Sequence, residues 1–166
     1  MDSIKIELQV LIECLRKKEQ ALKQIADITE NQGFVLSSGA PHDEIYSYFM
    51  QMNTEKQTFI QKVMQCDEVF TNMLEKIGPT LDADPKKYRE QVITLQDLIR
   101  AVTDVDVRIR VIEDKNTQVL TEELRKLPNR LSGRVDSAEK PETIQSGEYG
   151  KSHVIDAYKN QSRHRK

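Results

Sequence analysis

Glycine and proline are scarce in this chain and fall in three groups. The 166 residues include six glycines and five prolines, which leave three stretches without either residue: 1–32, 42–77 and 86–127. β-Strands average about five or six residues and are joined by turns rich in glycine and proline. Uninterrupted stretches of this length therefore argue against an all-β or α/β fold and favour long helices.

Tryptophan is absent, and only 37% of the residues are hydrophobic, whereas 31% are charged. This balance suits long helices that each carry one apolar stripe and a wide charged face. No apolar run approaches the ~18 residues of a membrane span, so we expect no membrane insertion. Residues 1–5 have neither the basic start nor the apolar block of a signal peptide, which predicts a cytoplasmic protein.

The chain also lacks a strong excess of basic charge. Its net charge of −2 divides into +3 for residues 129–166 and −5 for residues 1–128. An acidic body does not offer the positively charged surface that nucleic acid binds, so we expect no nucleic-acid partner. Cys14 and Cys66 lie far apart in the sequence and belong to no ligand cluster, so in a reducing compartment they are expected to be free thiols.

Apolar residues recur at helical spacing along each long stretch. Steps of three and four residues from Ile45 meet apolar residues or cysteine at nine of ten positions, with Lys56 as the exception. The same steps from Ile4 are interrupted by Lys18, and those along the third stretch by Asn116. This spacing places one apolar stripe on each helix, facing a partner. Lys56 and Asn116 are candidates for setting helix register, although lysine stems at such positions more commonly reach outward to solvent.

The predicted fold is all-α: an elongated antiparallel three-helix hairpin with a flexible C-terminal tail. We expect helices over about 2–32, 42–77 and 85–127, with Gly33 and Gly78 at helix ends and Asp84 capping a helix that has Pro85 as its first residue. The short links favour antiparallel neighbours. Residues 1–128 would form the body, and residues 129–166, which have no apolar periodicity, the tail.

The third stretch is the longest, which predicts that its last turns extend beyond the other helices. An overhanging apolar stripe at Leu120, Leu124 and Leu127 would be a protein-binding surface. Two alternatives stay open: the N-terminus of the first helix covers the stripe, or a second copy does so in a homodimer. The tail holds one small apolar cluster, residues 154–158, which is either a recognition segment or without function.

Groups suited to catalysis are few, so we expect neither an enzyme nor a cofactor. His42, His153 and His164 have no carboxylate at metal-ligand spacing, and neither a phosphate-binding glycine loop nor a nucleophile elbow occurs. Asp104 and Asp106 stand two residues apart, and on a helix they would point to different sides. We expect both aspartates to face solvent.

The polar and apolar stripe residues together resemble the FlgN family of flagellar export chaperones. Leu15-x-x-Lys18-Glu19-x-x-Leu22-x-x-Ile25, followed by Thr29 and Gln32, resembles the first helix of the family. Lys56-x-x-x-Ile60 with Asp67-x-x-Phe70 resembles the second, and Glu113-x-x-Asn116-x-x-x-Leu120 is similar to the third. The resemblance covers residues 1–127 in the expected order.

This resemblance implies a cytoplasmic chaperone that keeps hook-associated proteins from aggregating and delivers them to the flagellar type III export apparatus. It implies that a helical C-terminal segment of the substrate binds the C-terminal region of the chaperone, and that the tail contacts the export gate. Tyr158 and Ile155, with Tyr149 second, are the candidates for the gate contact. The substrate-binding candidates are Ile109, Ile112, Asn116, Leu120, Leu124 and Leu127.

Two other functions remain open at this stage. The first is the sister chaperone class that serves the filament-cap protein, which also uses a helical hairpin. The second is a coiled-coil scaffold with no role in secretion.

Overall fold

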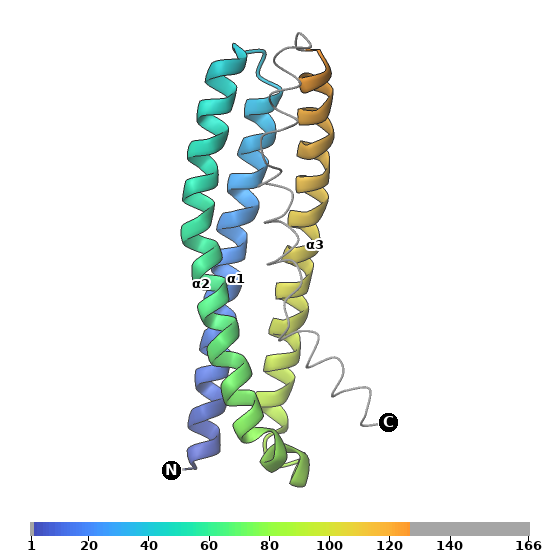
Figure 1. The fold of residues 1–166 in the computed structure, drawn as a ribbon. Helices are drawn as coiled ribbons and strands as arrows, with labels where there is room; N and C mark the ends of the chain where they lie inside the picture. The colour runs from blue at the N-terminus through green and yellow to red at the C-terminus, as the bar shows by residue number, and fades with distance from the viewer. Residues whose placement is uncertain (1, 127–166) are drawn as a thin grey trace.

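The computed structural model describes residues 2–126 and contains three long helices in that range: α1 (Ser3–Leu36), α2 (His42–Ala83) and α3 (Arg89–Arg125). The helices lie side by side in one elongated bundle (Figure 1). α2 runs antiparallel to α1 and α3, so the α1–α2 turn and the end of α3 lie at the same end of the bundle. The predicted all-α antiparallel fold is confirmed, whereas the predicted tail, 129–166, lies outside the described residues.

The helix α1 is the centre of the bundle. Both α2 and α3 pack along it, whereas the backbones of α2 and α3 hardly approach each other. α1 accordingly buries a wide stripe, because it faces two helices at once. Its fully buried residues include Leu8, Leu11, Leu22 and Ile25, which join α2 and α3 side chains in the main core.

Two glycines that were predicted to end helices lie inside them instead. α1 continues past Gly33 to Leu36, and α2 continues past Gly78 and Pro79 to Ala83. Burial explains both extensions: Leu36 packs in a second apolar cluster with Ile45 and Phe49, and Leu81 packs in the main core. The gain from burying these leucines outweighs the weak helix preference of glycine and proline.

The predicted cap at the start of the third helix is also wrong. Asp84 is the C-cap of α2, residues 85–88 form a turn, and α3 begins at Arg89. Tyr88 fixes this turn because its ring is buried and its hydroxyl donates to Asp2 Oδ2 at 2.8 Å. Asp2 in turn accepts from the Ile4 backbone N–H at 3.0 Å and caps α1. The α2–α3 turn is therefore attached to the start of α1.

Candidate functional site

The six substrate-binding candidates do not form one exposed stripe. Ile109 is 1% exposed and Asn116 is 6% exposed, so neither side chain is accessible to a substrate in this bundle. Both lie on the side of α3 that faces α1, where Ile109 belongs to the main core. Ile112, Leu120 and Leu124 are half-buried, and Leu127 lies outside the described residues.

The predicted overhang of the third helix is absent from the described part of α3. The end of α3 lies beside the α1–α2 turn (Figure 1), because α1 is longer than predicted and α3 starts later. Leu120 packs against the second apolar cluster, which comprises Leu36, Ile45 and Phe49. Leu120 is therefore partly covered by the end of α1 and the start of α2. The N-terminus of the first helix, which one alternative proposed as the cover, does not contribute.

Exposed aromatic side chains surround this end of the bundle. Phe34, in the last turn of α1, is 71% exposed, and Tyr46, in the first turns of α2, is 69% exposed. Tyr48 is also exposed. We call these three residues together with Leu120 and Leu124 the end surface. The sequence analysis missed the aromatic part because it ended the first helix before Gly33, which left Phe34 in a linker, whereas α1 runs to Leu36.

Charged residues of both signs border the end surface. His42 Nε2 lies 3.5 Å from Glu123 Oε2, and Lys126 donates to Glu123 Oε1 at 3.2 Å. The hydrogen bond from Lys126, assisted by its charge and by His42, lowers the pKa of Glu123. These contacts link the end of α3 to the first residue of α2.

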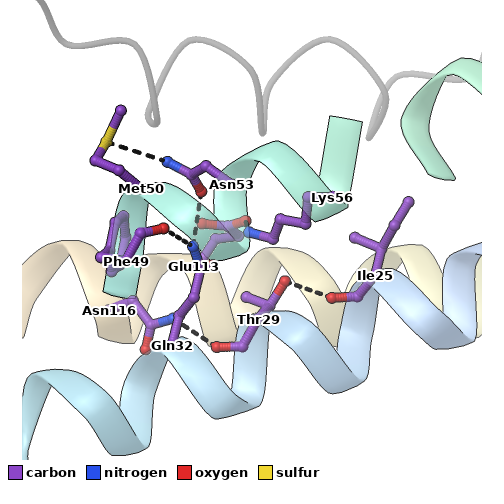
Figure 2. A network of polar contacts seen from close by, with 9 residues as sticks. All are labelled: Ile25, Thr29, Gln32, Phe49, Met50, Asn53, Lys56, Glu113 and Asn116. Atoms are coloured by element: carbon purple, nitrogen blue, oxygen red, sulfur yellow. Dashed lines mark hydrogen bonds and ion pairs between the residues drawn. The ribbon is translucent and has the colours of Figure 1, made fainter. Parts of the chain in front are cut away.

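Polar side chains are buried between the helices below the end surface (Figure 2). Lys56 Nζ of α2 lies 2.6 Å from Glu113 Oε1 of α3. Asn116 Nδ2 donates to the Thr29 carbonyl at 2.9 Å, which joins α3 to α1. Gln32 Nε2 of α1 donates to two α2 acceptors, the Phe49 carbonyl at 3.2 Å and Asn53 Oδ1 at 2.7 Å. Each pair of helices is therefore joined by a polar contact in this region.

A further ion pair lies nearer the middle of the bundle, where Nζ of the buried Lys18 of α1 is 2.6 Å from Oδ1 of the half-buried Asp67 of α2. Seven of the polar residues in the quoted sequence segments take part in cross-helix polar contacts, Thr29 through its backbone carbonyl: Lys18, Thr29, Gln32, Lys56, Asp67, Glu113 and Asn116.

Asp106 was expected to face solvent, and this expectation is wrong. Its side chain is buried, and its Oδ1 has no hydrogen-bond partner, whereas Asp104 is exposed as predicted. Burial raises the pKa of Asp106 to about 6. The signal was present in the sequence: Asp106 stands seven residues after Ile99 and seven before Glu113, two positions that α3 also buries.

The other predicted groups are placed as follows. Cys14 and Cys66 are half-buried free thiols, and burial raises the pKa of both. Within residues 2–126, no group of three or more histidine, cysteine or acidic side chains is arranged to hold a metal ion, and no helix is long and apolar enough to cross a membrane. The gate-contact candidates Tyr149, Ile155 and Tyr158 lie outside the described residues.

Comparison of the chain with models of known protein families, with curated proteins and with solved structures gave no match.

Proposed function

We propose that this protein is a cytoplasmic flagellar export chaperone that binds a helical C-terminal segment of a hook-associated protein, protects it from aggregation and delivers it to the export apparatus. The observation that carries the proposal is the end surface, where half-buried Leu120 and Leu124 of α3 lie at the same end of the bundle as three exposed aromatic residues. Exposed apolar groups gathered at one end of a charged protein are typical of an interaction site.

The chemistry of the end surface fits an amphipathic helix as its ligand. Leu120 and Leu124 stand four residues apart, so they present neighbouring apolar side chains along one side of α3. Phe34 and Tyr46 supply large apolar area with few rotatable bonds, which suits them as binding anchors. The FlgN resemblance of all three helices supports the identity of the ligand as a hook-associated protein.

The burial of Ile109 and Asn116 narrows the proposed site. These two residues hold α3 against α1 and contribute to the fold. Substrate contact is therefore assigned to the end surface alone, with Leu127 as a continuation outside the described residues.

The proposal is tested by two matched double substitutions on α3. The test variant carries Leu120→Asp with Leu124→Asp. The control carries Val107→Asp with Val111→Asp, which has the same spacing on the same helix at two exposed valines. Binding of the full chain to the C-terminal segment of a hook-associated protein is measured by calorimetry.

We expect the test variant to weaken binding by about 30-fold or more, because each buried apolar anchor contributes roughly 1–2 kcal/mol. The control should bind within about twofold of the wild type. Circular dichroism checks the fold, since Leu120 also packs against Leu36 and Phe49. If the double variant loses its helicity, Leu124→Asp alone, which lies outside that cluster, replaces it. Equal binding by the test and control variants would contradict the proposal.

A further inference from the structure

One charged side chain from each helix contributes to a layer near the middle of the bundle, in which the α1 and α3 groups are buried and the α2 group is half-buried. Lys18 of α1, Asp67 of α2 and Asp106 of α3 make up this layer, which we call the central charge layer. Lys18 is 1% exposed and its Nζ lies 2.6 Å from Asp67 Oδ1. Asp106 is 3% exposed, and its Oδ1 is buried without a hydrogen-bond partner.

The layer holds two carboxylates against one ammonium group. Lys18 is paired with Asp67, so the positive charge of Lys18 is shared between Asp67 and Asp106. Arg110, one turn farther along α3, is the other cation that acts on Asp106, and its own side chain is exposed. Burying a charged carboxylate with one oxygen that lacks a hydrogen bond is costly, so the neutral form of Asp106 fits this site better than the ionised form.

Electrostatics agree with this geometry. Burial is the largest influence and raises the pKa of Asp106 to about 6; Asp67 acts in the same direction, whereas Lys18 and Arg110 oppose it. A carboxyl group whose pKa is raised on folding stabilises the fold below its ordinary pKa. That stability is lost as the pH rises through about 6, so this part of α3 should be held more firmly in mild acid than at neutral pH.

The way in which α3 is attached to the bundle makes its position sensitive to the charge of this layer. The backbones of α2 and α3 hardly approach each other, so α3 is held mainly by α1 and by side chains that reach from α2. Val102 and Ile109, which flank Asp106 on the buried side of α3, would be exposed if this segment moved away from α1.

We propose that the central charge layer is a proton-operated latch for α3: protonation of Asp106 holds α3 closed onto α1 and α2, and ionisation of Asp106 makes local opening of α3 about the layer more frequent. This inference does not depend on the identity of the binding partner. It concerns a property of the free chain.

The test is hydrogen exchange of backbone amides in residues 99–113, measured on the full chain at about pH 5 and about pH 7.5 and corrected for the intrinsic exchange rate. A pKa near 6 in the closed state and an ordinary value in the open state predict an opening constant about tenfold larger at the higher pH. Asp106→Asn and Asp106→Leu should remove this difference. Asp104→Asn, an exposed neighbour on the same helix, should retain it.

Several results would overturn the latch. Wild-type opening constants that agree at the two pH values would do so, as would a tenfold difference that persists in both Asp106 variants. The latch also requires an uncharged side chain to be tolerated at this position at least as well as a carboxylate. Failure of both Asp106 variants to fold at either pH would therefore count against it.

Discussion

The ion pair between Lys56 and Glu113 offers the sharpest test of how the helices are held together. The two side chains are only 7% and 10% exposed, and the Nζ–Oε1 distance is 2.6 Å. Removal of one partner leaves the other charge buried without its counter-ion, which costs about 3–5 kcal/mol in folded proteins. Because the α2 and α3 backbones hardly meet, this contact is one of the few that link those helices directly.

The perturbation is a double-mutant cycle with Lys56→Met, Glu113→Leu and the combination of the two. We expect each single substitution to lower the free energy of unfolding by about 3–5 kcal/mol. The combined variant should lie within about 1 kcal/mol of the wild type, because two apolar side chains of similar size remove both charges together. Urea unfolding followed by circular dichroism measures these differences.

An exposed pair on the same bundle serves as the control. Arg100 and Asp97 are 3.4 Å apart, and both side chains are largely exposed. Arg100→Ala should therefore change stability by less than about 1 kcal/mol. The reasoning fails if Lys56→Met costs no more than Arg100→Ala, or if the two single effects simply add in the combined variant.

Three further predictions concern other parts of the chain. Gly33→Ala should destabilise the protein by about 1 kcal/mol, because the new Cβ would lie 2.7 Å from Asn116 Oδ1 and disturb the buried hydrogen bond of Asn116, which is worth more than the higher helix preference of alanine. In an Asn116→Ala background the same change should stabilise the protein, and urea unfolding distinguishes the two outcomes. Tyr88→Phe should lower the melting temperature at neutral pH, because the hydrogen bond from the Tyr88 hydroxyl is the chief cause of the lowered pKa of Asp2. The difference in melting temperature from the wild type should shrink as the pH falls below the range in which Asp2 is ionised. An equal difference at acid and neutral pH would refute this role of Tyr88. Deletion of residues 136–166 should leave helicity unchanged and weaken export more than substrate binding, as judged by circular dichroism, calorimetry and a secretion assay; loss of folding would show that this segment belongs to the body.

Helix number, order and direction could be predicted because each long stretch carries an apolar period that polar residues interrupt at only a few positions. The helix ends could not be predicted, since Gly33 and Gly78 were given weight as local stop signals. In the folded bundle, Leu36 and Leu81 bury apolar surface beyond those residues, and this gain decides where the helices end. The surfaces of the neighbouring helices therefore decide where each helix ends, and a local sequence pattern does not contain them.

The candidate site could be predicted only in part, for a related reason. The position of Leu120 at the end of the bundle followed from the stripe, but its packing against Leu36 depended on the true length of α1. Asp106 was judged by its spacing from Asp104 alone, whereas its burial follows from a seven-residue relation to Ile99 and Glu113. Exposure is set by which neighbouring helix each position meets, so it has to be judged from the whole apolar period of a helix and not from the spacing of two residues.

The central claim, that the protein is a chaperone for hook-associated proteins, is tested most directly by mixing the purified full chain with hook-associated proteins and the filament-cap protein of the same host. Size-exclusion chromatography then shows which of them co-elutes with the chain. We predict a stable complex with a hook-associated protein. Co-elution with the filament-cap protein alone, or a large self-assembled oligomer that ignores every added partner, would contradict the claim.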